Sequence, residues 1–257
     1  MKDLFSVTGK IAVVTGGSRG IGAMIARGFV ENGVKTYITA RKNDELLETA
    51  KNLSQWGECI AIKSDLSTVS GISEFAHHLR DNEQQLHILV NNAGATWGAN
   101  IDDFPESAWD KVMDINVKSP FFLIQKLLPL LRAGATSNDP SRIINLSSMH
   151  GFINPKTDNY PYSASKAAIV QLTRHLAADL ATENINVNGI APGLFPSKMT
   201  AYMVNGHEEE VGAKIPRGRI GKMEDAAGTA IYLCSQASAW VTGHTIKLDG
   251  GEVAAAG

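Results

Sequence analysis

Short apolar runs alternate with stretches of helical periodicity along almost the whole chain. The short runs are rich in branched aliphatic side chains and are typical of buried strands. In the longer stretches, apolar residues recur every three or four positions, as they do in amphipathic helices. This alternation predicts βαβ units, in which consecutive strands run parallel and helices cover both faces of the sheet.

The expected elements follow one another without a linker rich in Pro, Ser and Gly. The strands are expected at 11–14, 35–39, 58–63, 88–90, 142–146, 185–190 and 245–248. The helices are expected at 20–31, 44–55, 69–80, 105–118 continuing through 121–131, 163–183 and 224–235. The sequence therefore predicts an α/β fold: one Rossmann-like, doubly wound domain over residues 1–257 with a seven-stranded parallel sheet.

One longer excursion, 194–214, interrupts this rhythm and carries the acids Glu208, Glu209 and Glu210. A segment of this length beside a site is typical of a mobile lid. A solvated surface helix explains the same acids equally well, so both interpretations stay open.

Charge and composition exclude several classes of function. The net charge of −2 and the pI near 6.4 provide no basic field for nucleic acid or for an anionic membrane. The first ten residues contain Asp3 and no apolar core, so no secretory signal is expected. The most apolar stretch, 121–131, contains Gln125 and Lys126 and is too short to cross a bilayer. We therefore expect a cytoplasmic protein.

Cysteine and histidine usage gives no support for a metal site. Cys59 and Cys234 lie far apart, each within an apolar pattern, and are interpreted as buried free thiols. The adjacent His77 and His78 do not have the spacing of metal ligands. No metal is expected.

A glycine-rich segment, 15–22, follows the first strand and opens directly into a helix. Glycines here let the backbone approach a pyrophosphate, and the helix N-terminus offers unpaired N–H groups. Glycines of a purely geometric turn are the alternative. The pattern and its position predict a dinucleotide site. The residues expected to form it are Gly16, Ser18, Arg19, Gly20, Ile21 and Gly22.

The end of the second strand indicates which dinucleotide binds. An acid at this point typically holds the ribose 2′-OH of NAD, whereas a cation accommodates the 2′-phosphate of NADP. Arg41 and Lys42 stand here, and Arg19 adds charge from a neighbouring loop. The competing acid, Asp44, fits better in the first turn of a helix. The sequence predicts NADP(H) as cofactor, with merely solvated cations as the alternative.

Two more strand ends lead to the same edge of the sheet. Asp65, followed by Leu66, is expected to accept a hydrogen bond from an adenine amino group. Asn92, Ala93 and Gly94 are expected to bring small-residue backbone close to the cofactor. Each segment alone would be an ordinary turn signal.

Tyr162 and Lys166 stand four residues apart near the start of an expected helix. Four residues advance about 6 Å and return to nearly the same face, so the ammonium is expected beside the phenol. Together with a positive nicotinamide ring, this cation is expected to lower the tyrosine pKa from about 10. Tyr162 then becomes the general acid and base. Tyr160 falls on another face.

Two further polar residues accompany this pair. Ser148 follows the fifth strand, where its hydroxyl is expected to hydrogen-bond a substrate carbonyl. Asn116 has poor helix propensity for a mid-helix position and needs a local reason to be there. A water held by Asn116 is expected to connect Lys166 with solvent.

With these motifs in this order, the sequence resembles the short-chain dehydrogenase/reductase family from Gly9 to Gly251. The matching segments are 15–22, 91–94, Asn116, Ser148, Tyr162 with Lys166, Pro192 with Gly193, and 249–251. The resemblance implies the catalytic residues Asn116, Ser148, Tyr162 and Lys166. It also implies cofactor contacts from Tyr162, Lys166, Pro192, Gly193 and Ser197. A homodimer or homotetramer, built partly from the helices around Phe121 and Ala168, is implied as well.

Within that family, segments 91–99 and 185–200 are similar to β-ketoacyl reductases of the rhamnolipid-linked type. Ser148 and Tyr162 lie one residue farther apart than in fatty-acid-synthesis members, which leaves the pocket shape open. Expected walls, with ordinary packing as the alternative, are Trp97, Met149, His150, Phe152 and 194–203.

The sequence thus predicts an NADPH-dependent carbonyl reductase, acting on a ketone such as a β-ketoacyl thioester, with Tyr162 as proton donor. A sugar or polyol oxidoreductase with the same residues is the first alternative. A non-catalytic NADPH-binding regulator is the second, and the intact Tyr162 and Lys166 argue against it. The expected partner is a small carbonyl or alcohol substrate. No basic helix for docking a carrier protein is evident.

Overall fold

The computed structural model describes residues 3–154, 156–198, 200–204 and 206–256. Its centre is one sheet in which all neighbouring strands pair in parallel, in the order β3-β2-β1-β4-β5-β6-β7. The strands are β1 Ile11–Thr15, β2 Lys35–Ala40, β3 Cys59–Lys63, β4 Ile88–Asn91, β5 Ser141–Leu146, β6 Ile185–Pro192 and β7 Thr245–Leu248. The predicted seven-stranded Rossmann-like sheet is confirmed. Strand order reverses between β1 and β4, and such a switch point leaves a crevice for ligands.

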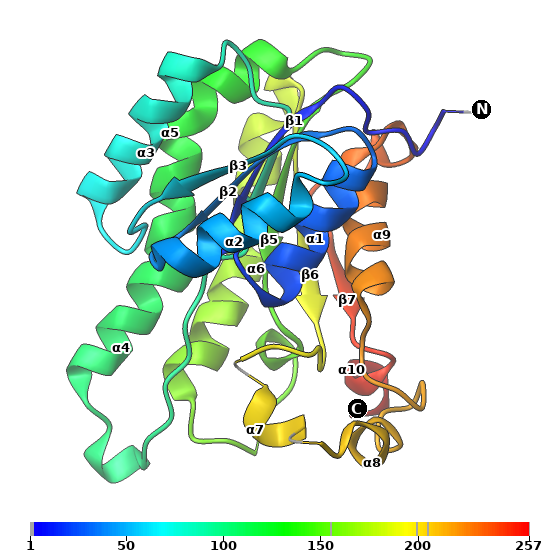
Figure 1. Cartoon of the computed structure of the whole chain (residues 1–257). Coiled ribbons are helices and arrows are strands. Elements are labelled where there is room, and N and C mark those ends of the chain that lie inside the picture. Colours follow the sequence, from blue (N-terminus) through cyan, green and yellow to red (C-terminus); the bar gives the residue numbers. More distant parts are fainter. Residues whose placement is uncertain (1–2, 155, 199, 205, 257) are drawn as a thin grey trace.

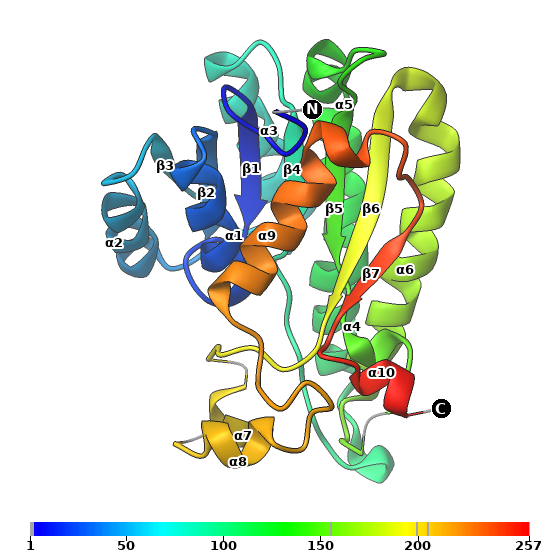
Figure 2. The ribbon, with the colours of Figure 1, turned by 90° about the vertical axis from the view of Figure 1, so that its right-hand side faces the viewer.

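Helices cover both faces of the sheet (Figures 1 and 2). The helices are α1 Gly20–Glu31, α2 Asn43–Leu53, α3 Val69–Asn82, α4 Glu106–Met113, α5 Ser119–Gly134, α6 Tyr160–Leu180, α7 Ala201–Val204, α8 Glu208–Gly212, α9 Met223–Cys234 and α10 Glu252–Ala255. Ala12 and Val14 of β1 pack with α1, α2 and α9, whereas Val13 packs with α3, α5 and α6. This alternation along one strand produces the two layers of core.

One helix boundary that affects the site differs from the expectation. α6 begins at Tyr160, not at 163, because Pro161 in its first turn has no N–H that would be left unpaired. The helix expected at 105–118 does continue through 121–131, and a π-helical turn, Asp114–Lys118, joins α4 to α5. The π-helical turn contains Asn116.

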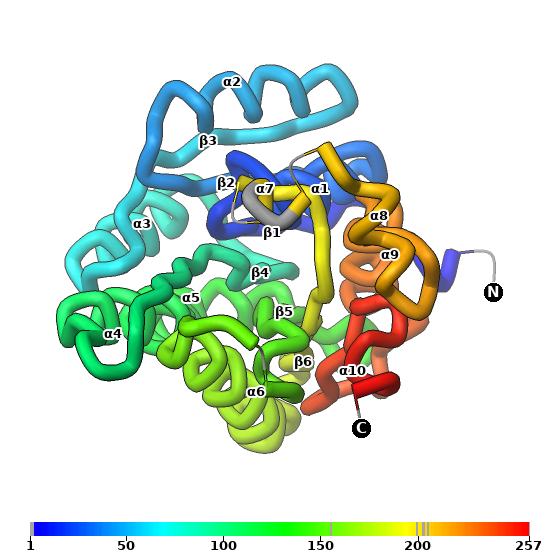
Figure 3. The backbone as a smooth tube through the Cα atoms, turned by 90° about the horizontal axis from the view of Figure 1, so that it is seen from below, coloured from blue at the N-terminus to red at the C-terminus, as the bar shows by residue number. Residues whose placement is uncertain are grey.

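The segment 194–214 contains the two short helices α7 and α8, which lie beyond the carboxyl ends of the strands (Figures 1 and 3). The acids of α8 are exposed, as a solvated helix requires. Met199 and Asn205 of this segment lie outside the described residues.

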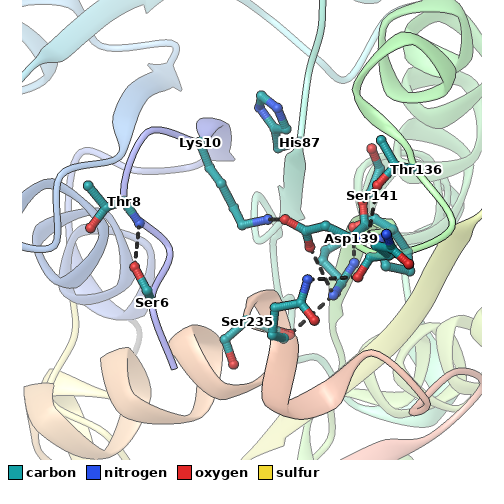
Figure 4. Close-up of polar contacts among 12 residues, drawn as sticks. Ser6, Thr8, Lys10, His87, Thr136, Asp139, Ser141 and Ser235 are labelled. Carbon is teal, nitrogen blue, oxygen red and sulfur yellow. Dashed lines mark hydrogen bonds and ion pairs between the residues drawn. The ribbon is translucent and has the colours of Figure 1, made fainter. Parts of the chain in front are cut away.

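A group of charged and polar side chains lies at the amino-terminal ends of the strands, opposite their carboxyl ends (Figure 4). Lys10 pairs with Asp139, and Arg142 Nη2 donates to Asp139 Oδ1 at 3.4 Å and to the Ser235 carbonyl at 3.1 Å. His87 Nδ1 accepts the Ile11 N–H at 3.0 Å. These contacts tie the starts of β1, β4 and β5 to the end of α9.

Asp139→Ala is expected to destabilise the fold by about 2 kcal/mol, because it leaves the side chains of Lys10 and Arg142 buried without their carboxylate. The loss falls below that of a fully buried pair, since the Asp139 side chain is 35% exposed. Urea unfolding of both proteins measures the difference. A loss near zero would mean that water already screens these charges.

Candidate active site

A cavity of about 710 Å³ opens at the carboxyl ends of the strands. It gathers most of the residues expected to bind the cofactor. Those that line it are Gly16, Ser18, Arg19, Gly20, Ile21, Arg41, Lys42, Asp65, Leu66, Asn92, Ala93, Gly94, Tyr162, Lys166, Pro192, Gly193 and Ser197. Ser148 lines it too, whereas Gly22 and Asn116 do not.

The glycine-rich loop packs against Asn92, which follows β4. Asn92 Nδ2 donates to the carbonyls of Thr15 at 2.9 Å and Gly16 at 3.1 Å. A Cβ on Gly22 would lie 2.4 Å from this nitrogen, and one on Gly16, where φ is +64°, would lie 2.9 Å from it. Gly22 itself does not line the cavity. Gly22 stands behind the loop and allows this close packing.

Thr15, at the end of β1, was not anticipated as part of the site. Its hydroxyl oxygen accepts the N–H groups of Asn92 and Ala93, both at 2.9 Å, and donates to the Val90 carbonyl at 3.3 Å. It thus fixes the backbone after β4 against the glycine-rich loop. Its place directly before Gly16 is the only signal that the sequence offers for this role.

Cations gather at the end of the cavity nearest α2. Arg41 and Lys42 line it as expected, and Asp44 lies in the first turn of α2. Glu45, which was not anticipated, and Lys198, from the expected wall 194–203, also line this end. The carboxylate of Glu45 pairs with Arg19 Nη1 at 3.0 Å and with Lys198 Nζ at 2.6 Å.

Asp65 stands beside this group of cations. Its carboxylate accepts hydrogen bonds from the Ser67 N–H at 3.1 Å and the Ser67 hydroxyl at 2.7 Å. These bonds and the charge of Arg41 lower the pKa of Asp65 below its usual value. A carboxylate that remains ionised is a hydrogen-bond acceptor, as the expected adenine contact requires.

Tyr162 and Lys166 of α6 and Ser148 after β5 meet in the wall of the same cavity. Lys166 Nζ lies 5.5 Å from the centroid of the Tyr162 ring and donates to the Leu146 carbonyl at 2.7 Å. An ammonium has three donors, so this bond leaves others for a ligand. Burial lowers the pKa of Lys166 to about 8.

Burial raises the pKa of Tyr162 above its ordinary value, and the hydrogen bond with Ser148 acts to lower it. The same apolar surroundings disfavour the charged form of Lys166. The expected lowering of the Tyr162 pKa depends also on the positive nicotinamide ring, and it stays a prediction.

Asn116 holds neighbouring backbone in place. Its side-chain amide was expected to hold a water that connects Lys166 with solvent. Its Oδ1 accepts the Ala95 N–H at 2.9 Å, and its Nδ2 donates to the Ala95 carbonyl at 3.0 Å and to Ser165 Oγ at 2.9 Å. Both amide hydrogens are used. The side chain thus ties the backbone that follows β4 to α6, and the expected water bridge from this amide is not supported.

Lys166→Met is expected to remove a pH dependence of stability. Folding lowers the pKa of Lys166 to about 8 from an ordinary 10.5, so between these values the unfolded chain binds more protons. Stability of the wild type therefore rises with pH in this window. From pH 8 to about 9.5, Lys166 contributes a gain of about 2 kcal/mol, which the Met variant lacks. Urea unfolding of both proteins at the two pH values tests this, and parallel pH profiles would contradict it.

The expected pocket walls are confirmed in one segment only. Phe195, Ser197, Lys198 and Thr200 line the cavity, whereas the predicted wall residues Trp97, Met149, His150 and Phe152 do not. Two of these aromatic groups pack under cations, Trp97 with Lys111 and Phe152 with Lys247. His150 packs edge-on against Tyr162 at 5.7 Å.

Cys59 and Cys234 are free and buried, as expected. Within the described ranges, no group of three His, Cys, Asp or Glu side chains is placed to hold a metal ion. In the same part of the chain, every helix falls short of the length and apolar character needed to cross a membrane.

Comparison with known proteins places this site in a family. Residues 15–252 match the family described as enoyl-(acyl carrier protein) reductase. The rhamnolipids biosynthesis 3-oxoacyl-[acyl-carrier-protein] reductase of Pseudomonas aeruginosa is 48% identical over 98% of this chain and 99% of its own length. The 2-dehydro-3-deoxy-D-gluconate 5-dehydrogenase of Bacillus subtilis is 35% identical over 98% of this chain and 97% of its own.

A solved structure agrees with these sequence matches. The Pseudomonas aeruginosa RhlG/NADP active-site complex superposes with a TM-score of 0.94 at 47% identity, covering 98% of this chain and all of that one. Similarity on this scale extends over the sheet, the glycine-rich loop and the wall that carries Ser148, Tyr162 and Lys166. The chain therefore belongs to the short-chain dehydrogenase/reductase family.

Proposed function

We propose that this protein is an NADP(H)-dependent carbonyl reductase that reduces the ketone of a 3-oxoacyl thioester, with Tyr162 as the proton donor. The observation that carries the proposal is that Ser148, Tyr162 and Lys166 share one cavity wall while Arg41 and Lys42 border the far end of the same cavity. The 3-oxoacyl reductase activity named for the 48% identical Pseudomonas aeruginosa relative supports the substrate class.

The residues fit a dinucleotide phosphate. Gly16, Gly20 and Gly94 line the cavity, so that backbone without side chains faces the ligand. A Cβ on Gly94 would lie 3.0 Å from Asn116 Oδ1, which leaves little room for any other residue. Arg41 offers a planar fork to a phosphate, and Lys42 adds a point charge. NADP in the similar Pseudomonas aeruginosa structure agrees with this assignment.

The nicotinamide, when bound, would supply the hydride that reduces the substrate carbon. Ser148 and Tyr162 hold the carbonyl oxygen by donating hydrogen bonds to it. Tyr162 then transfers its hydroxyl proton to that oxygen. Lys166, fixed by the Leu146 carbonyl, would donate to the nicotinamide ribose and stabilise the phenolate left behind.

A second candidate substrate class is a sugar acid, because the 35% identical relative bears a sugar-acid dehydrogenase name. A panel of acetoacetyl thioesters, keto sugar acids, ketoses and polyols, each with NADPH or NADH (NADP⁺ or NAD⁺ for the polyols), distinguishes the classes. We expect the highest kcat/KM with a thioester and NADPH. Turnover confined to sugar acids would assign the enzyme to that substrate class instead. Tight NADPH binding without any turnover would favour a non-catalytic regulator.

We further propose a single domain over 1–257, located in the cytoplasm and assembled as a homotetramer, with 194–214 as substrate lid. Exposed apolar side chains support self-association: Phe121 of α5 is 38% exposed, and Trp240 is 99% exposed. A contact between copies would remove this apolar surface from water. The mass of the protein in solution tests the assembly.

A further inference from the structure

Glu45 joins three parts of the chain at the α2 end of the cavity. It lies in the first turn of α2, and its two carboxylate oxygens bind different cations. Arg19, directly before α1, donates to Oε2 at 3.0 Å, and Lys198, from 194–214, donates to Oε1 at 2.6 Å. Both bonds lower the pKa of Glu45, so it remains a carboxylate.

The first part of 194–214 is held by hydrogen bonds beside the glycine-rich loop. Ser197 Oγ and Thr200 Oγ1 lie 3.0 Å apart, and Thr200 Oγ1 also donates to the Phe195 carbonyl at 2.6 Å. A Cβ on Gly20 would lie 3.3 Å from Ser197 Cβ. Lys198 therefore extends toward the cavity from a turn held by hydrogen bonds. Arg19 and Lys198 are far apart in sequence, yet both side chains reach Glu45.

The charges at this end suit a dianion better than a carboxylate. Arg19, Arg41, Lys42 and Lys198 line the cavity together with the acids Glu45 and Asp65, whereas its other acids, Asp110 and Asp114, belong to α4 and the π-helical turn. A phosphate monoester carries about two negative charges and three acceptor oxygens near pH 7. It therefore attracts a pair of cations more strongly than a single carboxylate does.

We propose that Lys198 is a further ligand of the cofactor 2′-phosphate, held ready together with Arg19 by Glu45. On binding NADP(H), the phosphate takes both cations from Glu45, and Lys198 fastens 194–214 over the cavity. NAD(H) has no phosphate at this point and leaves the segment unfastened. Binding of NADP(H), but not of NAD(H), thereby holds 194–214 over the substrate. The inference rests on the proposed NADP(H) dependence and adds the residue that transmits it.

Lys198→Ala tests the contact in binding measurements that need no turnover. Its dissociation constant for NADPH, measured by nicotinamide fluorescence, is expected to rise about tenfold, the effect of one charge-assisted bond. That for NADH is expected to stay unchanged. Lys214→Ala is the matched control, because Lys214 belongs to the same segment, pairs with Glu210 and does not line the cavity. Equal losses for both cofactors, or no loss, would overturn the proposal.

Proteolysis after Glu208, Glu209 and Glu210 gives a second readout, because Lys198→Ala leaves these cleavage sites intact. NADPH, but not NADH, is expected to slow cleavage of the wild type, and this protection should vanish in Lys198→Ala. Glu45→Gln should be cleaved faster without cofactor, whereas Glu48→Gln, an exposed position on the same helix, should match the wild type. Equal protection by both cofactors would overturn the link. If wild type does not prefer NADPH at all, the proposed cofactor itself fails.

Discussion

Tyr162→Phe is expected to lose about 10³-fold in kcat for carbonyl reduction while keeping its affinity for NADPH. The substitution removes the hydroxyl that donates the proton and spares the ring, which packs against His150. Removal of a positioned general acid costs 10²- to 10⁴-fold. Single-turnover oxidation of NADPH with an acetoacetyl thioester measures the rate, and nicotinamide fluorescence measures binding.

Tyr160→Phe is the matched control, because Tyr160 lies on the same helix but does not line the cavity. Its hydroxyl faces Asp158 at 3.3 Å, and we expect wild-type turnover from this variant. A Tyr162→Phe enzyme with near-normal kcat and intact NADPH binding would remove Tyr162 from the mechanism. A loss of equal size in both variants would indicate damage to the start of α6 instead.

The order of strands and helices was predictable because each element is specified by its own local pattern. Val13 turns to one face of the sheet and Val14 to the other, and this alternation is readable in a few letters. Boundaries were less accessible. The start of α6 at Tyr160 depends on Pro161, whose missing N–H costs nothing in a first turn.

The main parts of the site were predictable where chemistry sits at the end of a strand. Parallel strands bring their carboxyl ends to one side of the sheet, so Ser148, Arg41 and Asp65 line the same cavity. This placement does not depend on the sequence of the loops between them. The contact between Glu45 and Lys198 follows no such rule. It joins α2 to a distant excursion of the chain, and only the folded path of 194–214 brings them together.

The sequence predicts that Tyr162 and Lys166 lie close together, but it does not predict how deeply they are buried. A spacing of four residues gives proximity on a helix, but it says nothing of how much water reaches the pair. In the fold, Lys166 is buried against the Leu146 carbonyl, and burial determines the pKa of both side chains. Proximity can be read from the sequence, whereas solvation depends on the tertiary structure.

Asn116→Ala is expected to destabilise the fold by about 4 kcal/mol and to lower kcat/KM at least 10²-fold. It removes three hydrogen bonds and leaves the N–H and carbonyl of Ala95 without their partners, each at a cost of about 1–3 kcal/mol. The loop released at Ala95 carries Gly94 and Ala93 of the cavity wall, so a loss of cofactor affinity should accompany the loss of stability.

Ser165→Ala separates the two possible origins of this effect. It removes only the bond from Asn116 Nδ2 to α6 and the bond from the Ser165 hydroxyl to the Tyr162 carbonyl, while Asn116 keeps its hold on Ala95. We expect about 1 kcal/mol of lost stability and an almost unchanged dissociation constant for NADPH. Urea unfolding and fluorescence titration compare the variants. Should Ser165→Ala weaken NADPH binding as much as Asn116→Ala does, the packing of α6 against the π-helical turn would shape the cavity, and the tether at Ala95 would not.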